Sequence, residues 1–159
     1  MALKNIKIIS MTINEAQDFL KTLIINTESR SELRAYKKFL SILISLKKKE
    51  LTDQQFQLID QELDSLKIDA DIENRKKHIN KALAKLEKFL KKEFSFITEG
   101  YYMAIGMVLG MSVGIALGTS FGWSGQGIGI GMAVGLAVGA GIQAKAKKDG
   151  KVLETKLEE

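Results

Sequence analysis

Forty-five consecutive residues, Gly100–Ala144, contain no Asp, Glu, Lys or Arg, although these four types make up 27% of the 159-residue chain. As one helix this stretch would be about 68 Å long, whereas the hydrocarbon core of a bilayer is about 30 Å thick. Two helical spans, at about 101–121 and 126–144, fit better, with the turn-forming sequence GWSGQG at 122–127 between them. The sequence therefore predicts a transmembrane helical hairpin within residues 96–144.

Two other folds of this stretch stay open from the sequence. A glycine-rich hairpin can be buried in a soluble protein, although the first 99 residues offer little to cover so large an uncharged segment. The alternation of large and small residues also matches the period of two of a β-strand. A lone β-hairpin would leave unpaired strand edges in lipid, and Ala, Leu and Met favour helix, so we expect helices.

Basic residues flank the uncharged stretch on both sides, while the loop between the spans carries no charge. Positively charged flanks stay in the cytoplasm, so we expect both termini there and the loop across the membrane. Trp123 and the pair Tyr101 and Tyr102 suit the two membrane–water interfaces. The first twenty residues lack the long apolar run and cleavage site of a signal peptide. We expect a location in the bacterial inner (cytoplasmic) membrane, with residues 145–159 as a charged cytosolic tail.

Residues 1–95 are predicted to form a cytosolic domain of amphipathic helices at about 13–26, 30–49, 53–67 and 73–95. Capping boxes, in which a hydroxyl is followed by Glu or Gln three residues later, mark helix starts at Thr12, Ser29 and Thr52. Apolar residues at spacings of three and four then continue each pattern. The opening LKNIKIIS fits a short strand or an irregular arm. The expected fold class is all-α, an N-terminal helical bundle followed by a C-terminal glycine-zipper transmembrane helical hairpin.

The fourth predicted helix is rich in lysine and leads directly into the first span. A basic helix beside a membrane attracts anionic headgroups by roughly 1 kcal/mol per Lys or Arg near the surface. The candidate membrane-surface residues on both sides of the hairpin are Lys81, Lys85, Lys88, Lys91, Lys92, Lys145, Lys147 and Lys148. The lysines of the helix could equally form the solvated face of an ordinary bundle. Nucleic acid is disfavoured as a partner because no exposed aromatic residues interleave with them.

Glycine recurs every four residues in both spans, which places it on one face of each helix. In lipid, helices associate through close backbone approach of small residues, because apolar burial gives no driving force there. The predicted helix-packing glycines are Gly106, Gly110, Gly114, Gly118, Gly122, Gly127, Gly131, Gly135 and Gly139. A second small-residue set lies on roughly the opposite face, at Ser112, Ala116, Ser120, Ala133 and Ala137. Two small faces predict a homo-oligomer, unless the second face meets another helix of the same chain.

The sequence contains no recognisable catalytic or metal-binding constellation. His78 is the only histidine, and there is no cysteine. The acidic residues between Asp60 and Glu73 lack the spacing and the glycine of an EF-hand. The run GQGIGIGMAVG lacks the preceding strand and the later acidic residue of a dinucleotide-binding loop. We therefore expect no enzymatic activity, no cofactor and no metal.

The alternation GMSVGIALG followed by GMAVGLAVGAG resembles glycine-zipper membrane segments, and the hairpin region resembles small bacterial two-span glycine-zipper membrane proteins. It is also similar to the pore helix of the small-conductance mechanosensitive channel, and the domain plan is similar to that of pore-forming colicins. These resemblances imply a homo-oligomeric channel or pore, for example a toxin or defence effector, controlled by the cytosolic helices. The alternative is a non-conducting membrane anchor or scaffold whose helical domain binds a protein partner. The spans contain few polar residues, so any pore would be narrow or gated by dewetting.

Overall fold

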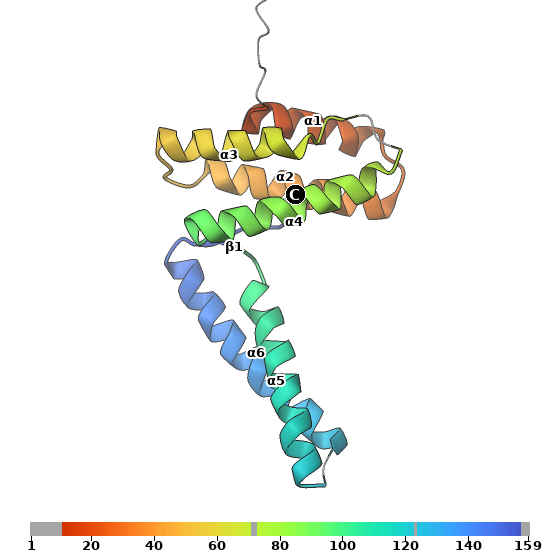
Figure 1. Cartoon of the computed structure of the whole chain (residues 1–159), viewed down its shortest axis with the longest axis vertical. Helices are drawn as coiled ribbons and strands as arrows, with labels where there is room; N and C mark the ends of the chain where they lie inside the picture. Colours follow the sequence, from red (N-terminus) through yellow and green to blue (C-terminus); the bar gives the residue numbers. More distant parts are fainter. Residues whose placement is uncertain (1–10, 71–72, 123, 157–159) are drawn as a thin grey trace, which may run out of the picture. The chain divides into compact units, whose positions relative to one another are not determined.

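A computed structural model describes residues 11–70, 73–122 and 124–156 (Figure 1). Within these ranges the chain is all-α, as expected, with six helices and one pair of two-residue strands. The described residues divide into two units. One runs to Phe94 and includes Thr155 and Lys156, and the other is Ser95–Glu154. The opening LKNIKIIS lies outside the described residues.

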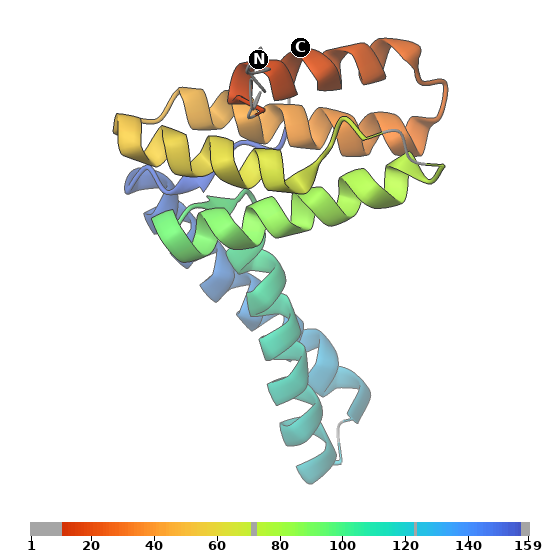
Figure 2. The same ribbon diagram turned by 45° about the horizontal axis from the view of Figure 1, so that its top comes forward.

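The first unit, which we call the helical unit, is a bundle of four helices. They are α1 (Ile13–Asn26), α2 (Arg30–Lys47), α3 (Asp53–Leu66) and α4 (Arg75–Phe94). α1 and α4 each pack on both α2 and α3 (Figures 1 and 2). The predicted apolar stripes form the core, and each fully buried large side chain there contributes about 1.5–3 kcal/mol. Members of this core include Tyr36, Phe39, Leu43, Ile59 and Leu86. The observed helix ends lie within two residues of the predicted ones.

Two of the three predicted capping boxes are present. Thr12 Oγ1 accepts the Glu15 N–H while Glu15 Oε2 accepts the Thr12 N–H at 2.9 Å, and Thr52 makes the same arrangement with Gln55. The predicted box at Ser29 is wrong, since its side chain makes no cap bond. Glu32, which would complete the box, instead accepts a hydrogen bond from Thr27 Oγ1 at 2.7 Å. α2 still begins after Ser29, because packing of its apolar face stabilises the helix.

Polar side chains from distant positions hold the ends of two bundle helices. At the start of α1, Asp64 Oδ1 accepts the Met11 N–H at 3.0 Å and Asp60 Oδ1 accepts the Ile13 N–H at 2.9 Å. Backbone N–H groups at a helix N-terminus lack intrahelical acceptors, so these carboxylates satisfy them. His78 is half-buried, and its Nε2 lies 3.0 Å from the Lys67 carbonyl oxygen at the end of α3. This histidine is therefore part of the bundle structure.

The second unit is a hairpin of α5 (Tyr101–Ser120) and α6 (Ser124–Lys148). β1 (Ile97–Thr98), just before α5, pairs in parallel with β2 (Val152–Leu153), just after α6. Two backbone hydrogen bonds hold the pair, from Ile97 N to Lys151 O at 2.9 Å and from Glu99 N to Leu153 O at 3.1 Å. The parallel pair therefore brings the two ends of the hairpin together at its base.

The predicted division at residue 145, between the hairpin and a charged tail, falls within α6. α6 continues through Lys145, Lys147 and Lys148, because positive charge is favourable in the last turn of a helix. β2 follows within the same unit. Beyond β2, Lys156 belongs to the first unit, where its carbonyl oxygen accepts a hydrogen bond from Ser41 Oγ at 2.9 Å. The helical unit is thus built from two separate stretches of the chain.

Candidate functional site

α5 and α6 meet along the glycines that recur every four residues in each helix. Glycines in the middle of this contact each lie between two glycines of the other helix, so that Gly110 meets Gly131 and Gly135, and Gly114 meets Gly127 and Gly131. A Cβ atom added to Gly110 would overlap the Gly131 carbonyl oxygen and lie 2.8 Å from Gly135 Cα. No larger residue fits without separating the two backbones. The predicted glycine faces therefore pair the two helices of one chain.

This glycine interface runs along most of the hairpin. It extends to Gly106 and Gly139 near the base and to Gly118 near the turn. Gly122, predicted in the same row, lies outside it, since a Cβ added there would meet nothing within 4 Å. Its φ of +74° is left-handed, a conformation that glycine adopts at no steric cost. Gly122 therefore forms the turn and does not contribute to helix packing.

The second small-residue set points away from the glycine interface. Ser112, Ala116, Ser120, Ala133 and Ala137 are all exposed. On the same side of α6, a Cβ added to Gly129 or Gly141 would meet nothing within 4 Å. We call this the outer small face. Within the described residues of the hairpin, neither α5 nor α6 covers it.

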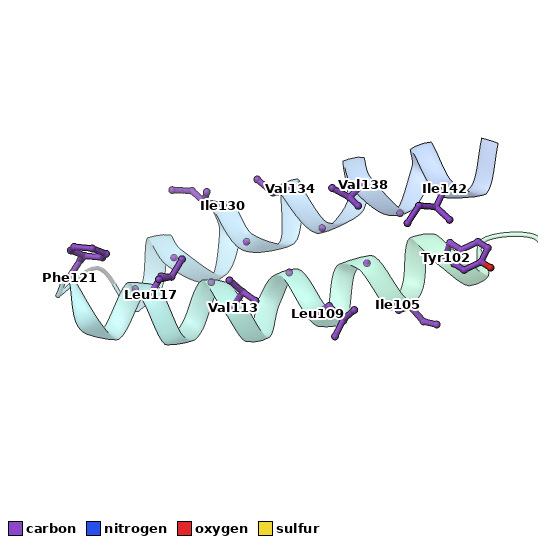
Figure 3. A pocket seen from close by; sticks show the side chains of 18 residues that line it. Tyr102, Ile105, Leu109, Val113, Leu117, Phe121, Ile130, Val134, Val138 and Ile142 are labelled. Atoms are coloured by element: carbon purple, nitrogen blue, oxygen red, sulfur yellow. The ribbon is translucent and has the colours of Figure 1, made fainter. Parts of the chain in front are cut away.

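An apolar groove runs along one side of the hairpin, with the interface glycines as its floor (Figure 3). It encloses about 550 Å³ and has almost no polar lining. Large side chains at intervals of four residues form its walls, which are Ile105, Leu109, Val113, Leu117 and Phe121 on one side and Ile130, Val134, Val138 and Ile142 on the other. The sequence showed the four-residue glycine period that forms the floor of this groove. It did not show that walls from both helices would share one groove.

Four polar side chains of the spans bond to the backbone of the hairpin itself. The hydroxyls of Ser112, Thr119 and Ser120 donate to carbonyl oxygens one turn earlier in α5, at 2.9–3.0 Å. Gln143 is buried on α6, and its Oε1 accepts the Tyr102 N–H at 3.2 Å, at the start of α5 where intrahelical acceptors are lacking. The oxygen atoms of all four side chains thus have partners within the hairpin, whereas the buried Nε2 of Gln143 has none among the described residues.

The outside of the hairpin is apolar on every side. Among the described residues, every exposed large apolar side chain except Ile25 and Leu58 belongs to it. Both helices are long and apolar enough to cross a membrane, and only 11% of the apolar window of each is buried. The apolar helices of a soluble core would be mostly buried. The hairpin therefore fits a membrane protein with two transmembrane helices. The β alternative is wrong, because both segments are helical.

The predicted membrane-surface lysines lie along α4 and at the end of α6. Lys81, Lys85, Lys88, Lys91 and Lys92 of α4 and Lys145, Lys147 and Lys148 of α6 are all exposed. Lys92 forms an ion pair with its neighbour Glu93 at 3.0 Å. The lysines in the last turns of both helices also interact favourably with the helix dipole, whatever else they contact.

Over residues 11–70, 73–122 and 124–156, no group of three or more His, Asp or Glu side chains is placed to hold a metal ion. No protein-family model, curated protein or solved structure matches this chain.

Proposed function

We propose that this chain is an integral membrane protein whose α5–α6 hairpin spans a bilayer and anchors the four-helix unit at its surface. The uncharged turn crosses the membrane, and the basic flanks keep both termini on the cytoplasmic side. The membrane in question is the bacterial inner membrane, as the basic flanks and the resemblance to two-span bacterial proteins suggest. The helical unit is then available to a protein partner.

One observation carries this proposal. The hairpin exposes apolar side chains all round, while the hydroxyls of Ser112, Thr119 and Ser120 donate to carbonyl oxygens of its own backbone. Lipid offers no hydrogen bonds, so a span must satisfy its polar groups internally. A water-filled pore would instead need polar groups turned toward the water. This arrangement supports an anchor without a conducting path.

Insertion can be tested by alkaline carbonate extraction of membranes from expressing cells. We expect the chain to stay in the membrane pellet and to be lost from it when Val113→Arg and Val134→Arg are combined. Each arginine at the centre of a span costs about 2.5–3.5 kcal/mol on insertion scales. Ile25→Arg with Leu58→Arg is the matched control, because both residues are exposed on the helical unit. Extraction of the unmodified chain, or equal behaviour of the two double variants, would contradict insertion.

A second candidate function is an assembled pore, and the outer small face favours it. Small residues are what lipid-embedded helices use for close approach, and here they remain uncovered. Under this hypothesis Ala116→Leu would lower the assembled mass in detergent and abolish conductance in planar bilayers. Ile115→Leu should change neither, because it nearly preserves the apolar volume. The anchor proposal expects no unitary conductance from the unmodified protein, so reproducible conductance would favour the pore.

A further inference from the structure

α4 carries a row of like charges on one side. Lys77, Lys81, Lys85, Lys88 and Lys92 are all exposed, and at about 100° per residue they fall within an arc of about 80°. We call these five residues the lysine face. The buried side chains of α4 lie on the opposite side of the helix, and they are Ile79, Ala82, Leu83, Leu86 and Leu90. The lysine face therefore takes no part in the core of the bundle.

No carboxylate shares this arc. The two acidic residues of α4, Glu87 and Glu93, each lie about 80° outside it. Glu87 pairs with Lys38 of α2 at 2.8 Å. Within the described residues, the ion pair of Lys92 with Glu93 is the only one that engages the lysine face. Positive charge on this side is thus largely uncompensated by the protein.

We propose that the lysine face binds anionic phospholipid headgroups at the surface of the bilayer that holds the hairpin. This inference rests on the proposed membrane insertion and names the lipid class involved. Lys92 precedes the first residue of α5, Tyr101, by nine positions, so the row of charge is tied closely to a span. Lysine-rich segments beside a transmembrane helix are held by anionic headgroups within about one Debye length of the surface.

The chemistry of the face favours a lipid surface over nucleic acid. It contains only lysine, a point charge on a flexible stem, and no arginine fork for fixed two-point contacts. It presents no aromatic ring on which a base could stack. The row from Lys77 to Lys92 is about 22 Å long, which suits several mobile headgroups in a plane. Each lysine contributes about fivefold to the binding equilibrium, so three together contribute about a hundredfold.

The test uses the full chain in lipid nanodiscs. Because the chain has no cysteine, a fluorophore on Ala84→Cys reports from an exposed position beside the lysine face. Quenching by spin-labelled headgroups is compared in discs of phosphatidylcholine alone and in discs with one part phosphatidylglycerol to two parts phosphatidylcholine. We expect at least twofold stronger quenching with phosphatidylglycerol, and we expect molar salt to reverse this increase.

The difference between the two kinds of disc should disappear in the triple variant Lys81→Gln, Lys85→Gln and Lys88→Gln. The control triple Lys21→Gln, Lys37→Gln and Lys47→Gln removes the same charge elsewhere and should retain it.

Co-elution of the chain with the discs is measured on the same samples and reports insertion separately. Failure to co-elute would contradict the proposed function. If the chain co-elutes with the discs but quenching is the same with and without phosphatidylglycerol, the lipid assignment alone is overturned. The same holds if quenching falls equally in both triple variants. A response of the fluorophore to a short DNA duplex but not to phosphatidylglycerol would likewise overturn it, in favour of nucleic acid.

Discussion

Asp60 places a carboxylate against the first turn of α1, where it accepts the Ile13 N–H. Partial burial raises its pKa above the ordinary 3.8, and the nearby Glu15 carboxylate adds to this effect, while the bond from Ile13 opposes it. The folded state therefore binds this proton more tightly than the unfolded state. It follows that the contribution of Asp60 to stability is greatest below the ordinary pKa and is lost as pH rises through the raised one.

Asp60→Asn keeps an oxygen acceptor for the Ile13 N–H and removes the charge. We expect it to be at least as stable as the unmodified protein at pH 7, with a smaller decline in stability between pH 4 and pH 7. Asp60→Ala removes the acceptor and should destabilise the bundle by about 1–2 kcal/mol. Urea unfolding of the helical unit, followed by circular dichroism at both pH values, measures these changes. Equal losses for both variants at pH 7 would mean that the charge itself stabilises the start of α1.

At the scale of elements, the two hairpin helices depend on the absence of side chains at their contact. Gly131 and Gly129 lie on the same helix, two positions apart, but a Cβ on Gly131 would lie 2.7 Å from Gly114 Cα while one on Gly129 would meet nothing within 4 Å. The obstacle at Gly131 is backbone, which cannot rotate away. The same substitution should therefore have opposite effects at the two positions.

We expect Gly131→Ala to destabilise the hairpin by about 1–3 kcal/mol, because the helices must move apart. Gly129→Ala should be neutral or slightly stabilising, since alanine is the better helix former. The midpoint of unfolding in detergent micelles titrated with dodecyl sulfate, followed by helical circular dichroism, compares the two variants. Equal tolerance at both positions would show that the glycine interface does not hold the hairpin together.

Local signals explain which elements could be predicted from the sequence. Capping at Thr12 and Thr52, together with apolar spacing, predicted the bundle helices, because both signals act within one or two turns. The four-residue glycine period likewise predicted the faces that pair. The missed contacts join residues far apart in the chain, such as Asp60 with Ile13, Gln143 with Tyr102 and β1 with β2. No local pattern encodes such pairings, and the groove depends on the register between two helices.

At the scale of the whole molecule, the helical unit recruits a segment from beyond the hairpin. Ser41 is buried on α2 and donates to the Lys156 carbonyl oxygen, 115 positions later in the sequence. A fragment of residues 1–95 retains all four bundle helices but lacks this acceptor. The two stretches are therefore expected to be coupled in stability.

We expect the 1–95 fragment to fold as a cooperative helical bundle, about 1 kcal/mol less stable to urea than the same unit in the full chain, because one hydrogen bond is lost. Ser41→Ala should reduce stability more in the full chain than in the fragment, because only the full chain contains the Lys156 acceptor. Circular dichroism during urea titration measures all four species. A fragment that is mainly unstructured, or a similar effect of Ser41→Ala in both contexts, would contradict this coupling.

The parallel pair at the base of the hairpin has a consequence for the order of biosynthesis. β2 follows α6 in the chain, so the ribosome makes it only after both apolar helices. Until then β1 has no strand to pair with. Once α5 and α6 have paired, the two strand segments are already neighbours, and joining them costs little further chain entropy. Closure of this pair is therefore a late event that marks a completed hairpin, and a chain stalled after its first span would leave β1 without its partner.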